Sequence, residues 1–336
     1  MRPLRGVPAV GDRLLVTGGS GFIGSHVVRA LLSPTSSTHP APAEVRLLAH
    51  RRAVRLPETG RGVVREVPSG LDDHVALREL CDGVDTVVHL ANRVEGTLEE
   101  CASVNVDGTR ALLRAAAAAG VRRVLYLSTT AVYEDGCHRG VPEDGPPRRP
   151  VSAASLTRLR AEEMVLEAGG MVVRPHLVYG AGDRWVVPMV ARLLPELPGW
   201  IDAGDSRMTL IAVDDLARAL AALALAPWEH DTPAVLHAGH PEPVTSRELF
   251  TAVADALELP LPSRDISLAR ARLLLGAEQD ARRARLLSLV ATDHWYDCSR
   301  IWPITGSAAG AGFAQGFARH ASWYRQHHRA SAAGVS

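Results

Sequence analysis

Short apolar runs alternate with longer amphipathic segments through the first half of the chain. The run RLLVT at residues 13–17 predicts a buried strand, and the apolar spacing of the following FIGSHVVRALL is that of a helix. Further strands are predicted in EVRLLAH, REVPSG, DTVVHLAN, RRVLYLSTTAVY and MVVRP, with helical segments among them. Strands that alternate with helices build parallel sheets, so we expect an α/β fold with a doubly wound parallel sheet.

The second half of the chain has a different pattern. A loop rich in proline and glycine is expected at about residues 134–150, and beyond residue 180 the segments are mainly helical and too scattered for a second independent sheet. We therefore predict an α/β domain at 13–180 and a smaller, mainly helical region at 181–325. A frayed tail is expected at 326–336.

The turn after the first strand has the composition of a phosphate-binding loop. In TGGSGFIG, Gly18 permits a tight turn, Gly21 lets the backbone approach a pyrophosphate, and Gly24 allows the helix to pack closely on the strand. Position between a strand and a helix favours a cofactor site over a merely structural turn. The same site is expected to include Thr17, Phe22 and Ile23. We therefore predict that 13–180 is a dinucleotide-binding domain of the Rossmann type and that 181–325 is the substrate-binding region.

The end of the second strand bears on the choice of nicotinamide cofactor. An acidic residue there would bind the ribose hydroxyls of NAD, whereas an arginine suits the 2′-phosphate of NADP. His50, Arg51 and Arg52 stand at this point, which favours NADPH, with NADH as the other possibility. The alternative interpretation is that two arginines in an arginine-rich chain are ordinary solvated charges.

Composition narrows the classes of function. The formal net charge is zero, so no broad attraction to nucleic acid or to an anionic membrane is expected. The chain contains no lysine, which excludes a lysine Schiff base or a lysine acid. Its cysteines lack CxxC spacing, and no run of about 18 apolar residues is present, so we expect a cytoplasmic protein with reduced thiols. No spacing typical of a metal site is found.

Five motifs occur in order along the chain: TGGSGFIG, VVHLAN, NVDGT, LSTTAVY and VVRPHLVYGAGD. Together they resemble the motifs of the extended short-chain dehydrogenase/reductases, and the resemblance covers roughly residues 13–325. It implies an oxidoreductase with a nicotinamide cofactor and a small-molecule substrate. The oligomeric state is left open.

The resemblance also implies roles for particular residues. The cofactor would be contacted by Leu71, Leu90, Ala91, Asn92, Asn105, Pro175, His176 and Leu177. Asn92 would stand at the edge of the substrate space, and Asn105 would brace the catalytic strand. The expected substrate-binding residues are Asn92, Thr129, Tyr133, Trp185 and Met189, although Trp185 and Met189 could equally belong to the core or an interface.

The acid/base pair of this family is missing. By alignment, Ala154 stands where the family has a tyrosine and Arg158 where it has a lysine, and no tyrosine lies between Tyr133 and Tyr179. Arg158 could orient the cofactor ribose through its forked guanidinium, or it could be a surface arginine on an amphipathic helix. Proton delivery would then fall to the hydroxyl of Thr129 or Ser128, to water, or to the substrate itself.

That last option narrows the expected substrate. A ketone flanked by a phenolic hydroxyl is polarised internally and demands less from the protein. Within the family, the chain most resembles atypical ketoreductases of antibiotic pathways, so we expect an NAD(P)H-dependent ketoreductase acting on an aromatic polyketide-type, angucyclinone-like ketone. The alternative is a catalytically silent NADP-binding redox sensor or regulatory protein of the same fold.

Overall fold

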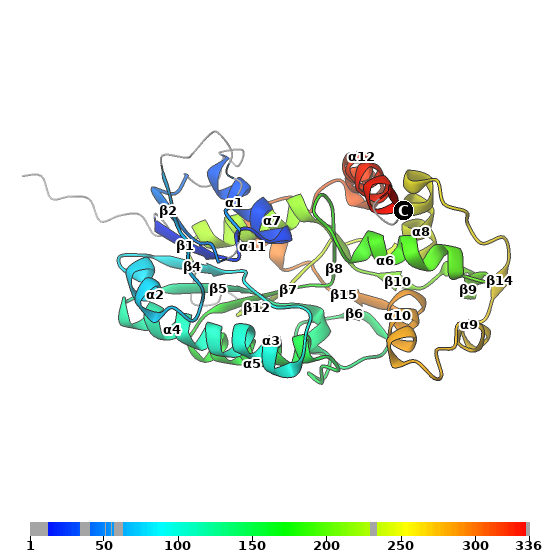
Figure 1. Cartoon of the computed structure of the whole chain (residues 1–336), viewed down its shortest axis with the longest axis horizontal. Coiled ribbons are helices and arrows are strands. Elements are labelled where there is room, and N and C mark those ends of the chain that lie inside the picture. The colour runs from blue at the N-terminus through cyan, green and yellow to red at the C-terminus, as the bar shows by residue number, and fades with distance from the viewer. Residues whose placement is uncertain are drawn as a thin grey trace, which may run out of the picture.

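The computed structural model describes residues 13–33, 41–50, 52–54, 56, 63–228 and 234–333. Two lobes lie side by side, one built on a large sheet and a smaller one formed mostly from the second half of the chain (Figure 1). The strands of the large sheet are β1 (Arg13–Thr17), β2 (Glu44–Leu48), β3 (Val64–Val67), β4 (Thr86–His89), β5 (Arg123–Leu127), β7 (Met171–Pro175) and β12 (Val235–Ala238).

The large sheet is parallel throughout and has the order β12-β7-β5-β4-β1-β2-β3. Its strand order reverses between β1 and β4. The connection after β1 leads to β2 on one side, and the connection after β4 leads to β5 on the other side. This arrangement confirms the predicted doubly wound sheet. Apolar strands such as β5, buried along their whole length, fit between two helical layers because a parallel sheet is covered on both faces.

Helices cover both faces of this sheet (Figure 1). One layer contains α1 (Phe22–Leu32), α7 (Val213–Leu225) and α11 (Ile301–Thr305). The other contains α2 (His74–Cys81), α4 (Thr109–Ala118) and α5 (Ala153–Glu167). The chain reaches α4 through α3 (Leu98–Ala102) and a π-helical turn, η2 (Ser103–Gly108).

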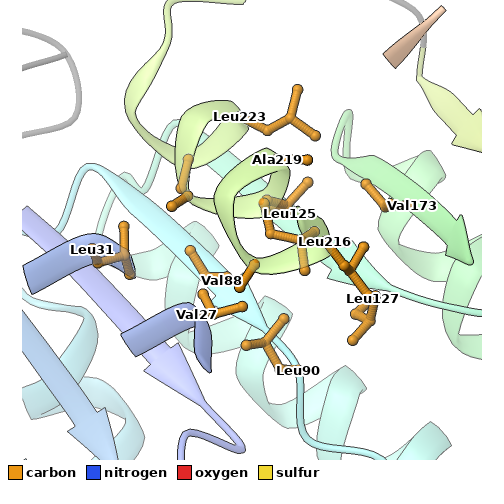
Figure 2. Close-up of a cluster of buried hydrophobic side chains, with 14 of the residues drawn as sticks. Val27, Leu31, Val88, Leu90, Leu125, Leu127, Val173, Leu216, Ala219 and Leu223 are labelled. Atoms are coloured by element: carbon orange, nitrogen blue, oxygen red, sulfur yellow. The ribbon is translucent and has the colours of Figure 1, made fainter. Parts of the chain in front are cut away.

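The core of the first layer follows from helical spacing. Residues three or four apart lie on one face of a helix, so α1 and α7 each present an apolar stripe to the sheet. Figure 2 shows these stripes against side chains from β4, β5 and β7, with Val27, Leu31, Leu216, Ala219 and Leu223 facing Val88, Leu90, Leu125, Leu127 and Val173.

The smaller lobe combines helices with short strands. Its helices are α6 (Val186–Leu193), α8 (Ser246–Leu257), α9 (Leu268–Leu274), α10 (Ala281–Ala291) and α12 (Gly312–Ala333). Its strands are β6 (His138–Val141), β8 (Leu177–Tyr179), β9 (Trp200–Ile201), β10 (Arg207–Met208), β11 (Leu210–Ala212), β13 (Val244–Thr245), β14 (Asp265–Ile266) and β15 (His294–Tyr296). The single-turn 3-10 helices are η3 (Thr130–Val132), η4 (Leu194–Glu196) and η5 (Asp202–Gly204).

Three features of this half differ from the sequence expectation. The strands β13, β10, β15 and β6 form a small sheet, and β6 lies inside the expected loop at 134–150. Both β12 and α7 come from 181–325 but belong to the large sheet and its helical layer. The helix α12 continues to Ala333, past the point where a frayed tail was expected. The strands of the small sheet have two to four residues and lack the apolar run that made the equally short β4 predictable.

A buried ion pair joins the large sheet to α5. Arg174 on β7 and Glu162 on α5 are 2% and 0% exposed, and Arg174 Nε lies 3.0 Å from Glu162 Oε1. Burial works against the charged guanidinium, but the hydrogen bond from Arg174 to Glu162 and their attraction raise the pKa of Arg174 above its ordinary value. Removing one partner would leave an uncompensated charge in the core.

We therefore predict that Glu162→Gln lowers the free energy of unfolding by about 3–5 kcal/mol, because Arg174 would keep its charge without a counterion. Urea denaturation of the purified protein measures this quantity. Glu163→Gln changes an exposed neighbour on the same helix and should stay within about 0.5 kcal/mol of the parent. Equal unfolding midpoints for the two variants would contradict the assignment.

Candidate active site at the carboxyl edge of the sheet

The glycine turn after β1 lies against the end of β4, where the strand order reverses. Gly18 has φ +74°, and a Cβ at this position would lie 2.5 Å from the backbone nitrogen of Ala91. A side chain at Gly24 would overlap the carbonyl oxygen of Gly18. Only glycine allows both close approaches, so the turn and the helix fit as tightly as a dinucleotide-binding loop requires.

The start of α1 is suited to bind a pyrophosphate. The helix begins at Phe22 after the N-cap residue Gly21, and no side chain caps its first N–H groups. A cavity of about 640 Å³ opens beside this turn, and Gly18, His50, Leu71 and Ala91 line it. Free donors beside a cavity of this size fit a nicotinamide dinucleotide.

Several other residues expected at the cofactor are not among the described residues that line this cavity. Arg52 is exposed, and Arg51 lies outside the described residues. Leu90 is buried in the core of the large lobe. Ile23 is half-buried in α1. Carboxylates also line the cavity, Asp72, Glu99 and Glu100 among them, and Glu100 pairs with Arg93 at 3.0 Å.

Thr17 belongs to a buried hydrogen-bonded chain across β1 and β4. Its hydroxyl accepts from the N–H of Ala91 at 3.3 Å and lies 2.6 Å from Nδ1 of His89. His89 Nε2 lies 2.9 Å from the hydroxyl of Thr109, which donates to the carbonyl of Asn105. Burial lowers the pKa of His89 to about 3, so this histidine is neutral and fully bonded. It holds strand ends together rather than acting as a base.

Asn92 has both of its amide atoms engaged by the protein. Its Oδ1 accepts from the hydroxyl of Tyr126 at 2.7 Å, and its Nδ2 donates to the carbonyl of Leu127 at 3.0 Å. The side chain therefore ties the end of β4 to β5. In this arrangement it positions the carboxyl edge of the sheet.

Asn105 lies in the π-helical turn, a conformation often found at functional sites. Its amide bonds the backbone of Arg93 twice, at 2.7 and 2.9 Å, and donates to the hydroxyl of Thr157 at 2.9 Å. It braces the loop after β4 and helix α5.

Helix α5 places Arg158 toward the site rather than on the outer surface. A guanidinium nitrogen of Arg158 donates to the carbonyl of Leu127 at 3.2 Å, and its Nε is buried without a hydrogen-bond partner among the described residues. Ala154, one turn earlier, offers no acid. The helix thus brings a fixed positive charge, but no titratable group, to the end of β5.

A second cavity, of about 200 Å³, opens beyond the end of β5. Thr129 and Leu177 line it, together with the rings of Tyr133, His138, His176, His294 and Tyr296. The charged residues Glu134, Asp135 and Arg285 also contribute to its wall. The Thr129 hydroxyl accepts from the N–H of Ala131 at 3.2 Å and keeps its own hydrogen to donate. Ser128 is fully buried, and its hydroxyl has no partner among the described residues.

His176 follows Pro175, the last residue of β7. Its Nδ1 lies 2.7 Å from the hydroxyl of Thr130, and its ring stacks on His294 with the centroids 5.8 Å apart. Burial, with the neighbouring histidines, lowers the pKa of His176 well below its ordinary value. The imidazole is therefore neutral and adds polarity to the cavity without a positive charge.

Tyr133 turns its hydroxyl away from the cavity. The phenol oxygen accepts from Arg174 at 2.8 Å and lies 2.7 Å from His237 Nε2, and the hydroxyl donates to the carbonyl of Glu143 at 3.0 Å. Burial raises the pKa of Tyr133 to about 12. The ring lines the cavity, but this phenol cannot replace the missing acid because its hydrogen is already donated inside the protein.

Trp185 and Met189 lie elsewhere. Neither is among the described residues that line the second cavity. Trp185 is 47% exposed at the start of α6, and Met189 packs against the core of the smaller lobe. The rings of His138 and His294, by contrast, were not expected at the site. They come from β6 and β15, short strands without a recognisable sequence pattern, and only their pairing brings them to Thr129.

Within the described residues, no group of three or more histidines, cysteines or carboxylates is arranged to hold a metal ion. None of the described helices is long and apolar enough to cross a membrane.

Comparisons with curated proteins reveal several reductases. The 2-alkyl-3-oxoalkanoate reductase of Stenotrophomonas maltophilia is 28% identical over 312 residues, which is 84% of this chain and 91% of that protein. The 4-hydroxy-2-methyl-3-oxo-4-farnesyl-3,4-dihydroquinoline-1-oxide ketoreductase of Stigmatella aurantiaca is 31% identical over 206 residues. This match covers 57% of the present chain and spans a little over half, 58%, of that ketoreductase.

Solved structures with the same fold contain NAD. DesIV, the dTDP-glucose 4,6-dehydratase of Streptomyces venezuelae, aligns with a TM-score of 0.69 at 26% identity over 94% of this chain and 97% of that one. MoeE5 in complex with UDP-glucuronic acid and NAD aligns with a TM-score of 0.69 at 27% identity, over 94% and 99% of the two chains. The model of the NAD dependent epimerase/dehydratase family matches residues 14–239. This protein therefore belongs to the NAD dependent epimerase/dehydratase family of extended short-chain dehydrogenase/reductases.

Proposed function

We propose that this chain is an NADPH-dependent ketoreductase that reduces a carbonyl of an aromatic polyketide-type, angucyclinone-like substrate in cytoplasmic antibiotic biosynthesis. The observation that carries the proposal is the second cavity, in which aromatic and imidazole rings surround the hydroxyl of Thr129 at the carboxyl edge of the sheet. Flat, partly polar rings suit a hydroxylated aromatic ketone, because aromatic surfaces pack in offset or edge-on contacts. The Stigmatella aurantiaca relative also acts as a ketoreductase, on a ring ketone.

NADPH is the proposed cofactor, and when bound it supplies the hydride that the carbonyl carbon accepts. The phosphate-binding turn would hold its pyrophosphate, and Arg158 would hydrogen-bond its ribose. His50 at the cavity wall and exposed Arg52 support a 2′-phosphate. The carboxylates on the same wall favour the alternative, NADH, so competition between the two cofactors is the direct measurement.

The chain can support reduction without a tyrosine/lysine pair. One positioned acid contributes about 10²–10⁴ in rate. Holding two reactants in attack geometry supplies effective molarities of about 10⁵–10⁸ M. An easily reduced ketone can therefore turn over on positioning, with Thr129 donating a hydrogen bond to the developing alkoxide. The proton itself comes from that hydroxyl, from water, or from a phenolic hydroxyl beside the carbonyl.

We predict that the purified protein consumes NADPH in the presence of polycyclic ketones that have a neighbouring phenol, and that it forms the corresponding alcohol. Absorbance of NADPH and mass spectrometry of the product measure the reaction. The same ketones with the phenol methylated serve as controls and should react more slowly, because internal polarisation is lost. Cofactor binding without turnover of any ketone would instead support a regulatory, redox-sensing role.

Thr129→Val is expected to lower kcat by about 10²-fold, since it removes the hydroxyl but keeps the branched shape. Thr129→Ser retains the hydroxyl and should stay near the parent. Steady-state kinetics with saturating NADPH separates these outcomes. Unchanged kcat in the valine variant would assign proton delivery to water or to the substrate.

Arg158→Met is expected to raise the Kd for NADPH about tenfold or more, because a hydrogen bond from a charged group is worth about 1.5–3 kcal/mol. Titration of cofactor fluorescence measures this affinity. Arg160→Met, a change at an exposed position on the same helix, is the matched control and should bind normally. Identical affinities for both variants would mean that Arg158 does not reach the cofactor.

A further inference from the structure

In the loop between β8 and α6, the N–H and the carbonyl oxygen of a single residue, Ala181, both contact histidine side chains. The N–H of Ala181 donates to Nδ1 of His320 at 3.3 Å, and the carbonyl oxygen of Ala181 lies 2.9 Å from Nε2 of His26. Gly180 and Gly182 flank this residue with φ of 134° and 98°. Two glycines in this region give the loop conformational freedom that the histidine contacts restrict.

A single carboxylate connects the two histidines. Asp214 Oδ1 lies 2.6 Å from His26 Nδ1. Asp214 Oδ2 lies 3.3 Å from His320 Nε2, an electrostatic contact without hydrogen-bond geometry. The hydrogen bond from His26, followed by the contact with His320, holds the pKa of Asp214 far below its ordinary value. We call His26, Asp214 and His320 the loop clamp, and it joins α1, α7 and α12.

The hydrogen-bond partners of His26 and His320 determine which nitrogens of each ring must be protonated. His26 faces two acceptors, the Asp214 carboxylate and the Ala181 carbonyl, so both of its nitrogens must be protonated to make both bonds. His320 Nδ1 accepts from an N–H and must be unprotonated. The complete clamp therefore requires a charged His26 beside a neutral His320.

The fastened loop packs on the cofactor turn. A Cβ at Gly182 would meet the ring of Phe22 at 3.0 Å, and this ring lies edge-on to His26 with the centroids 6.3 Å apart. Phe22 directly follows Gly21 and is the first residue of α1, whose N-terminus offers the free donors for a pyrophosphate. A displacement of the loop would therefore change the packing of Phe22 and, through Phe22, the position of the phosphate-binding turn.

Other ionisable groups near the clamp are paired or remain neutral. The ring of Tyr179 lies edge-on to His320, and burial raises the pKa of its phenol above the ordinary value. Asp215 on α7 pairs with Arg218 and Arg319 at 2.5 and 3.8 Å. Asp183, in the loop itself, accepts from the N–H of Val187 and from the hydroxyl of Tyr324, and burial raises the pKa of Asp183 above its ordinary value.

We propose that His26, Asp214 and His320 are positioning residues that make cofactor binding depend on pH, with a maximum between an acid and an alkaline decline. In acid, a proton on His320 Nδ1 removes the acceptor for the Ala181 N–H. In alkali, His26 loses one hydrogen and with it one of its two bonds. Each loss frees one side of the loop and loosens its packing on Phe22. The inference rests on the cofactor binding of the proposed function, but not on the identity of the ketone.

Binding of NADP⁺ by calorimetry between about pH 5 and pH 9 tests the proposal. Loss of one such bond should weaken binding about fivefold at either end of the range.

His320→Gln keeps an acceptor for Ala181 and a donor for Asp214 but cannot be protonated, so it should lose the acid decline. His26→Gln has a donor for only one of two acceptors, and it should bind weakly at every pH without an alkaline decline. His327→Gln, an exposed change on the same helix, should behave as the parent.

Hydrogen exchange at the Ala181 amide gives a readout that needs neither cofactor nor catalysis. Its protection, corrected for intrinsic exchange, should fall in acid in the parent and remain in His320→Gln. An acid decline of equal size in both proteins, constant protection of this amide, or no NADP⁺ binding at any pH would each overturn the proposal. Failure to reduce any ketone, with both pH effects present, would overturn the proposed reaction alone.

Discussion

The buried contact between Arg174 and Glu162 is the constraint on which the second cavity depends. A guanidinium and a carboxylate removed from water must stay together, so β7 and α5 cannot shift independently. The same guanidinium bonds the Tyr133 hydroxyl, which also contacts Glu143 and His237. The network thereby joins the large sheet to the chain that leads into the smaller lobe, and it fixes the ends of β5 and β7 where Thr129 and His176 stand.

Helix α5 shows why the family scaffold can survive loss of its acid/base pair. Its buried face still supplies Thr157 to Asn105, Glu162 to Arg174 and Arg158 to the end of β5. These contacts are structural and do not involve position 154, where a half-buried alanine stands. The fold therefore tolerates the missing tyrosine, and under the proposed function the chemical consequence would fall on the substrate, which would have to be easy to reduce.

The two cavities have separate roles in the proposed function, one for the cofactor and one for the substrate. The first would accommodate the dinucleotide beside Gly18 and Gly24, where a side chain would overlap the backbone. The second is small, and rings share its wall with Glu134, Asp135 and Arg285. Of the rings, the Tyr133 hydroxyl is already hydrogen-bonded inside the protein and His176 is neutral. On the proposed function, such a site would orient the ketone rather than supply a titratable acid, as catalysis by positioning requires.

The sequence by itself determined the parallel sheet, the glycine turn before the first helix and the absence of a Tyr/Lys pair. Apolar periodicity, glycine spacing and residue identity are local properties, so they can be read from short stretches of sequence without knowledge of the tertiary packing. Only the tertiary structure decided that β12 and α7 complete the large lobe, that Tyr133 turns inward, and that His138, His294 and Tyr296 gather beside Thr129. Those outcomes depend on pairing between short strands far apart in the sequence, where packing and burial of charge outweigh the weak preferences of a few residues.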